Sequence, residues 1–128
     1  MSTTKKVDVE GLHFEHRLWT NELGFFQDEL GIFEKRLSEL VQKYSDREVL
    51  AELEHFQNQF IRQKEVLDQL KHDIKVHDQA IGRILQNGGQ ANSDDVDRHV
   101  LVDEQMKTYR KIYGDLKIQF YEYLAKWM

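Results

Sequence analysis

Large apolar residues recur along three segments of the chain in steps that alternate between four and three positions. The average step of about 3.5 residues is the period of helices that pack in bundles and coiled coils. Aromatic residues are frequent at these positions, and we expect Trp19, Phe33, Phe60 and Trp127 in the core. The three series, here called seams, are Leu12, His16, Trp19, Leu23, Phe26, Leu30, Phe33, Leu37, Leu40 and Tyr44; Val49, Leu53, Phe56, Phe60, Gln63, Leu67, Leu70, Ile74, His77, Ile81 and Ile84; and His99, Val102, Met106, Tyr109, Tyr113, Leu116, Phe120, Tyr123 and Trp127.

Two interruptions separate the seams. The second seam starts two residues out of register with the first, which corresponds to a rotation of about 200° on a continuous helix. The sequence SDRE at 45–48 fits a capping box with Ser45 at the cap, so a new helix is expected to begin there. The Gly- and Asn-rich segment 87–93 predicts a loop, and Asn92 or Ser93 would cap the third helix.

Short connections make neighbouring helices antiparallel. We therefore predict an all-α fold: an antiparallel, up-down-up three-helix bundle with coiled-coil-like heptad packing. A domain-swapped or extended coiled coil would share the same seams and open the hairpin at Ser45. The chain is expected to form one domain over 1–128, with helices at roughly 8–44, 46–86 and 94–127 and a disordered segment at 1–7.

Composition narrows the functional classes. The chain has 128 residues, a formal net charge of −5 and no cysteine, so disulfides, thiolate metal sites and cysteine catalysis are excluded. The negative net charge and the absence of a long run of Lys and Arg residues argue against nucleic-acid and membrane-surface partners. No segment resembles a signal peptide or a membrane span of about 20 apolar residues. These features predict a soluble cytoplasmic protein.

The first predicted helix repeats one unit, ELGFF and then ELGIF, within residues 22–33. Glycine inside a helix costs roughly 1 kcal/mol relative to alanine, so two of them need a reason. Relative to the seam, both glycines occupy heptad position b, and three large apolar residues occupy position c; both positions face away from the core. Small residues permit close approach of another backbone. The residues expected in such an interface are Phe14, Leu18, Gly24, Phe25, Gly31 and Ile32.

The alternative interpretation is that these apolar side chains are ordinary surface residues, since scattered exposed apolar groups are normal. Asn21, Asp28 and Lys35 interrupt the row and favour that interpretation. Four apolar residues aligned on one face are more than isolated surface residues would produce. Two-fold homodimers are the commonest soluble oligomers. We therefore expect a helix of a second copy, or of another helical protein, to dock on this face.

Histidines gather at one end of the predicted bundle. If the chain turns between Tyr44 and Val49, facing residues of the first two helices have numbers that add to about 93, which places His16 level with His77. For the last two helices, the numbers of facing residues are expected to add to about 180. This sum places Asp103 level with His77, and it places His99 one turn nearer the loop.

Two interpretations of this end remain open. Imidazoles from three helices could hold a metal ion such as Zn²⁺, with His16, His77, His99 and Asp103 as the candidates. Alternatively, the histidines form a polar layer that fixes helix register, as Gln63 would do elsewhere. His13 lies one turn from His16, and Glu15 is a further candidate neighbour.

No metalloenzyme motif such as His-Glu-x-x-His and no nucleophile constellation occurs. His55 and His72 fall on outward positions and are expected at the surface. The sequence therefore favours a non-enzymatic helical-bundle interaction or scaffold protein that self-associates and carries no cofactor. The alternative is a histidine-rich metal-binding bundle, with possible enzymatic activity.

Overall fold

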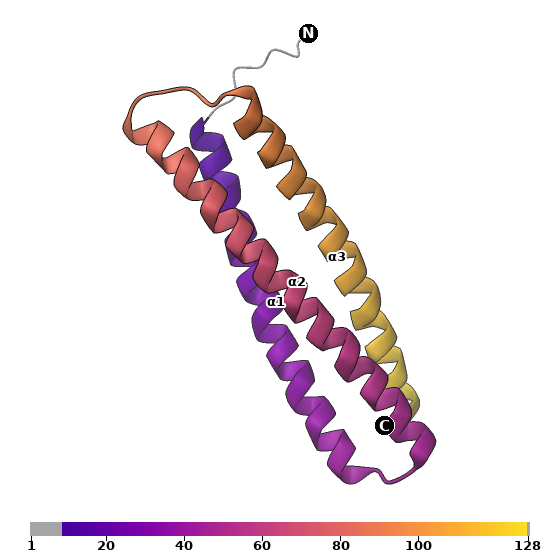
Figure 1. The fold of residues 1–128 in the computed structure, drawn as a ribbon. Coiled ribbons are helices and arrows are strands. Elements are labelled where there is room, and N and C mark those ends of the chain that lie inside the picture. Colours follow the sequence, from indigo (N-terminus) through magenta and orange to yellow (C-terminus); the bar gives the residue numbers. More distant parts are fainter. Residues whose placement is uncertain (1–8, 128) are drawn as a thin grey trace.

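A computed structural model describes residues 9–127 as three helices joined by two short connections (Figure 1). Successive helices run in opposite directions, so the start of α1 lies at the same end as the α2–α3 connection (Figure 1). The helices are α1 (Val9–Lys43), α2 (Arg47–Gln86) and α3 (Ser93–Trp127). The predicted three-helix bundle is confirmed. The segment 1–7, predicted to be disordered, lies outside the described residues.

The seams form the core. Leu23, Phe60, Met106 and Phe120 are fully buried, and nearly every other seam position is buried as well. The expectation that Trp127 belongs to the core is wrong, because its side chain is 40% exposed. It is the last residue of α3, so no further turn of that helix covers its ring.

Asp46, in the connection between α1 and α2, is the N-cap of α2. Its carboxylate Oδ1 accepts hydrogen bonds from the backbone N–H groups of Glu48 (2.9 Å) and Val49 (3.2 Å). The prediction that Ser45 caps α2 is therefore wrong by one residue. Asp46 immediately precedes the first helical residue and has the extended backbone that an N-cap needs, with φ −64° and ψ 129°.

The connection between α2 and α3 ends in a reciprocal cap. The N–H of Asp95 donates to Asn92 Oδ1 (2.9 Å), and the N–H of Asn92 donates to Asp95 Oδ2 (3.0 Å). This arrangement is a capping box, with Asp in place of the usual Glu or Gln. Of the two cap residues expected for the third helix, Asn92 and Ser93, the structure uses Asn92.

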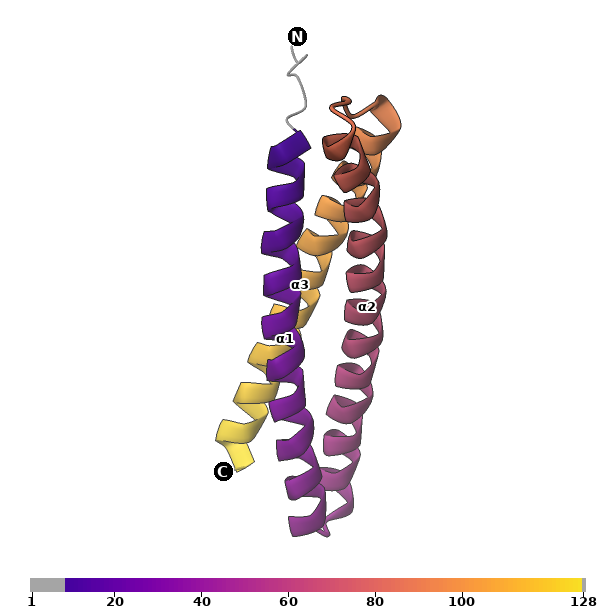
Figure 2. The ribbon, with the colours of Figure 1, turned by 90° about the vertical axis from the view of Figure 1, so that its left-hand side faces the viewer.

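α1 and α2 lie alongside each other, whereas α3 is inclined to both (Figure 2). Two carboxylates of α1 nevertheless hold α3 in register. Arg110 donates two hydrogen bonds of 2.8 Å to Glu22, and Glu29 accepts from Tyr113 Oη (2.6 Å) and from Lys117 Nζ (3.0 Å). The two glutamates are seven residues apart and therefore lie on the same side of α1. Their contacts fix which turn of α3 faces α1.

Candidate functional site

One histidine from each helix meets inside the bundle: His16 from α1, His77 from α2 and His99 from α3. We call these three residues the histidine layer. All three are buried, and their ring centroids lie 4.7 Å (His16–His77), 5.1 Å (His16–His99) and 5.9 Å (His77–His99) apart. Each residue offers a nitrogen, and these nitrogens all lie within 4.8 Å of one another.

Apolar side chains cover the histidine layer on both sides. A small cluster that includes Leu12 and Ile81 lies toward the start of α1, and the main core begins on the other side. The indole of Trp19 stacks on the His99 ring, with centroids 4.8 Å apart and an interplanar angle of 28°. The three imidazoles are therefore largely removed from water, and a buried polar atom without a hydrogen bond is costly.

Carboxylates contact two of the three rings from outside. Asp78 Oδ1 lies 2.8 Å from His16 Nδ1, and Glu15 Oε1 lies 2.7 Å from His99 Nε2. The same Asp78 oxygen lies 2.7 Å from Nδ1 of the partly buried His13. A carboxylate accepts hydrogen bonds, so each of these contacts places a proton on the outer nitrogen of the ring.

The inner nitrogens of these two rings face each other. His16 Nε2 and His99 Nδ1 are separated by 3.1 Å. His77 differs from both, because within residues 9–127 neither of its ring nitrogens has a hydrogen-bond partner although both are buried. The layer thus presents inward-facing nitrogens from three helices, with carboxylates only at its edge.

Burial controls the protonation of this cluster. Desolvation, reinforced by the neighbouring His16 and His99, lowers the pKa of His77 to about 4. Desolvation also lowers the pKa of His16, although Asp78 opposes that shift. Burial alone would raise the pKa of Asp78, but hydrogen bonds from His16 and His13 outweigh it and lower the pKa. At neutral pH the imidazole of His77 is therefore uncharged and able to act as a ligand.

The structure brings together the three histidines that the sequence proposed as metal ligands, but not the fourth candidate, Asp103. His16 and His77 are level, as predicted. His99 lies at their level rather than one turn nearer the loop, so its placement is corrected by one turn. Asp103 does not join the cluster; it pairs with Lys107 on its own helix at 3.0 Å. The register between α2 and α3 depends on the connection 87–92, whose path the sequence does not specify.

Sequence reasoning missed Asp78. Residues 15 and 78 have numbers that add to 93, as His16 and His77 do. The sequence therefore contained enough information to place Asp78 at the level of the histidine layer. Glu15, a further candidate in the sequence, does reach the layer. His55 and His72 are exposed, as expected.

The outer face of α1 is the second candidate site. We call Phe14, Leu18, Phe25 and Ile32 the outer stripe; their exposures range from 50% for Leu18 to 66% for Ile32. A Cβ added at Gly24 or Gly31 would have no heavy atom within 4 Å. Within the described bundle, no side chain packs closely enough to require glycine at either position.

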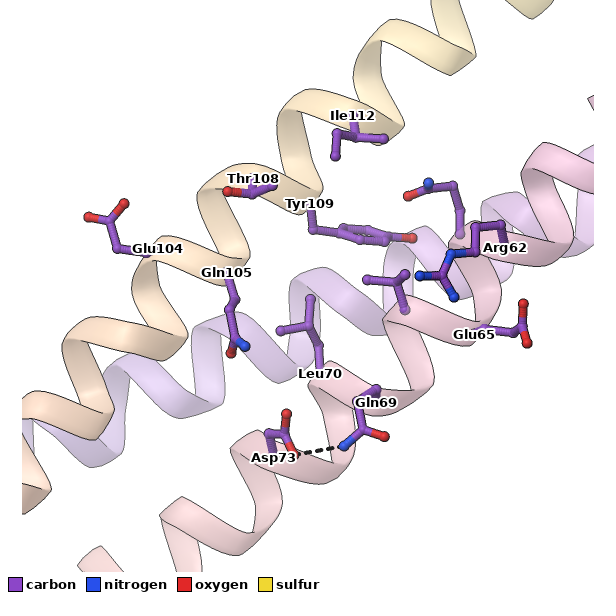
Figure 3. A pocket seen from close by; sticks show the side chains of 12 residues that line it. Arg62, Glu65, Gln69, Leu70, Asp73, Glu104, Gln105, Thr108, Tyr109 and Ile112 are labelled. Carbon is purple, nitrogen blue, oxygen red and sulfur yellow. Dashed lines mark hydrogen bonds between the residues drawn. The ribbon is translucent and has the colours of Figure 1, made fainter.

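A groove of about 560 Å³ lies between α2 and α3 (Figure 3). The ring of Tyr109 reaches across it from α3 toward α2, and Leu70 lies beneath it on α2 (Figure 3). The phenol oxygen of Tyr109 is buried without a hydrogen-bond partner in the described chain, and burial raises the pKa of this group. The charged side chains that line the groove are mostly acidic: Glu65, Asp73 and Glu104 are present with a single basic residue, Arg62.

Comparison of the chain with protein-family models, with curated proteins and with solved structures finds no match. None of the helices in residues 9–127 has an apolar stretch of the length needed to cross a bilayer. The histidine layer and the outer stripe are the two features of the molecule that bear on its function.

Proposed function

We propose that this protein is a non-enzymatic helical-bundle protein that acts through protein–protein contact, with a second copy of the chain docking on the outer face of α1. The observation that carries the proposal is the outer stripe itself. Four large apolar side chains, each at least half exposed, follow one face of a helix whose opposite face is already buried in the core. Covering them removes apolar surface from water, which stabilises a complex by roughly 25 cal/mol per Å² of buried apolar surface before the cost of association is subtracted.

The glycines support a helix as the partner. Gly24 and Gly31 lie seven residues apart, two turns along the same face of α1. Each lowers helix propensity by roughly 1 kcal/mol relative to alanine, and no contact within the bundle requires that loss. Without side chains at these two positions, a second helix can come close to the α1 backbone. A copy of α1 offers the same apolar groups and the same glycines, so a two-fold contact would be self-complementary.

Sedimentation velocity tests the proposal. The wild type is expected to be a dimer at tens of micromolar, and the double variant Gly24→Glu, Gly31→Glu is expected to be a monomer with unchanged helical circular dichroism. Gly82→Glu is the control: it places one glutamate at an equally open helical glycine on α2. That control should remain dimeric. A wild type that stays monomeric, or a control that dissociates like the double variant, would contradict the proposal.

A further inference from the structure

The hydrogen bonds around the histidine layer determine where its lone pairs point. His16 donates through Nδ1 to Asp78, so its neutral form has a lone pair on Nε2. His99 donates through Nε2 to Glu15, so its neutral form has a lone pair on Nδ1. These two lone pairs face each other across 3.1 Å. Two acceptors at that distance repel unless a cation lies between them.

We propose that His16, His77 and His99 bind one divalent transition-metal ion of the zinc type, through Nε2 of His16, Nδ1 of His99 and one ring nitrogen of His77. Zinc–nitrogen bonds of about 2.0–2.1 Å in a tetrahedral site place two ligand nitrogens about 3.3 Å apart. The 3.1 Å between His16 and His99 is close to this separation. One nitrogen from each of the three rings lies within 4.8 Å of the other two, so a movement of the His77 ring toward the other rings would complete the set.

His77 distinguishes a metal ion from a shared proton. A proton between His16 and His99 would satisfy that pair and leave both nitrogens of His77 buried without a partner. Such a group is costly in a dry core. A metal ion would bind all three inner nitrogens at once.

The surroundings fit a metal centre as well. Histidine ligands of metal ions almost always donate their other N–H to a carboxylate, a carbonyl or water, which fixes ring orientation and increases ligand basicity. Asp78 and Glu15 occupy those positions for His16 and His99, and their two negative charges balance a divalent cation. His13 contacts the same oxygen of Asp78 and helps to hold it in place.

The donor set selects the class of metal. Three imidazoles suit Zn²⁺, Co²⁺, Ni²⁺ or Cu²⁺ and do not suit Mg²⁺ or Ca²⁺, which prefer oxygen ligands. The chain has no cysteine, so no thiolate competes for the ion. Three protein ligands also leave a fourth coordination position for water or another small ligand.

Calorimetric titration of untagged protein with Zn²⁺ at pH 7.5 tests the site. We expect one ion per chain with a Kd in the low micromolar range or tighter, and a d–d absorption spectrum of tetrahedral type with Co²⁺. His16→Leu, His77→Leu and His99→Leu should each weaken binding at least 100-fold. His72→Leu, at an exposed histidine of α2, is the matched control and should bind as the wild type does. Absence of saturable binding by the wild type, or equal loss in the control, would overturn the proposal.

Two further variants test the site without altering the buried ligands. Asp78→Asn and Glu15→Gln keep the shape of the carboxyl groups, and each should weaken Zn²⁺ binding about 10–100-fold as outer partners of ligands do. Asp103→Asn removes a carboxylate that pairs with Lys107 outside the histidine layer, and it should leave binding unchanged. The melting temperature of each metal-free variant shows whether it folds. Unchanged affinity in both carboxyl variants would contradict the ligand geometry even if the leucine variants failed to fold.

Discussion

The bundle core contains two layers of similar construction, one of phenylalanines and one of histidines. The phenylalanine layer is Phe33, Phe60 and Phe120, one ring from each helix, with centroids 5.2–5.5 Å apart. The histidine layer has the same arrangement, with centroids 4.7–5.9 Å apart. Both sets occupy seam positions, so the helix geometry accommodates either kind of ring.

The two layers differ in what their atoms require. Phenylalanine contributes by contact and by removal of apolar surface from water, and its burial is complete once the rings touch. Each imidazole also buries two nitrogens, and burial without a hydrogen bond costs free energy. Asp78 and Glu15 meet this need at the edge of the layer, whereas His77 has no partner in the described chain. A seam position therefore determines how a ring packs. The polar groups around the layer determine whether the nitrogens of a buried imidazole have hydrogen-bond partners.

The largest expected effect is in the phenylalanine layer. Phe60→Ala removes a fully buried ring that contacts Phe33, Phe56 and Phe120, and it should lower the free energy of unfolding by about 3–5 kcal/mol. Urea denaturation measures this change. Ile61→Ala, at the exposed neighbouring position, should change stability by no more than about 0.5 kcal/mol. A loss below about 1 kcal/mol at Phe60 would mean that this layer is not closely packed.

The histidine layer should make stability depend on pH. The unfolded chain protonates His77 near pH 6.5, whereas the native state does so only near its lowered pKa of about 4. The unfolded state therefore binds more protons between these values, so stability is full above pH 6.5 and falls as the pH drops toward 4. At about 1.4 kcal/mol per unit, His77 alone removes about 2 kcal/mol between pH 6.5 and 5.

Chemical denaturation in the presence of a chelator measures this pH dependence without interference from metal. His77→Leu should reduce the slope, and His72→Leu, at an exposed position, should leave it unchanged. Equal stability of the wild type at pH 5 and pH 7.5 would contradict the burial of His77.

The same substitution should have opposite effects in the two layers. Metal-free His77→Leu replaces two unsatisfied buried nitrogens with carbon and should raise stability at pH 7.5 by about 1 kcal/mol. Phe60→Leu removes buried ring atoms and should lower stability. Denaturation midpoints of the two variants give the comparison directly. A less stable metal-free His77→Leu protein would show that His77 makes a favourable polar contact in solution.

The smallest expected effect lies at the α1–α2 connection, the end of the bundle nearer the phenylalanine layer. Asp46→Ala removes the N-cap of α2 and should cost about 1 kcal/mol. Ser45→Ala should leave the unfolding midpoint unchanged, because the structure assigns the cap to Asp46. A larger loss of stability for Ser45→Ala than for Asp46→Ala would indicate that Ser45 is the cap, as the sequence predicted.

The fold could be predicted from the sequence because it depends on local periodicity. The three seams specify three helices, and the short turn near Asp46 fixes which residues of α1 and α2 are level, so His16 and His77 were paired correctly. Predicting the cap failed by one residue because Ser45 and Asp46 are both good cap residues. The level of His99 depends on the connection 87–92 and on contacts such as Arg110 with Glu22, which periodicity does not specify.

Histidine ¹⁵N chemical shifts, measured at pH 7.5 without and with one equivalent of Zn²⁺, test the central claim most directly. That claim is that carboxylates fix the outer nitrogens of His16 and His99, so that three inner nitrogens converge on one ion. We expect Zn²⁺ to shift Nε2 of His16, Nδ1 of His99 and one nitrogen of His77, while Nδ1 of His16 and Nε2 of His99 stay protonated. Zinc-induced shifts confined to His55 and His72, or no shift in the histidine layer, would contradict the claim.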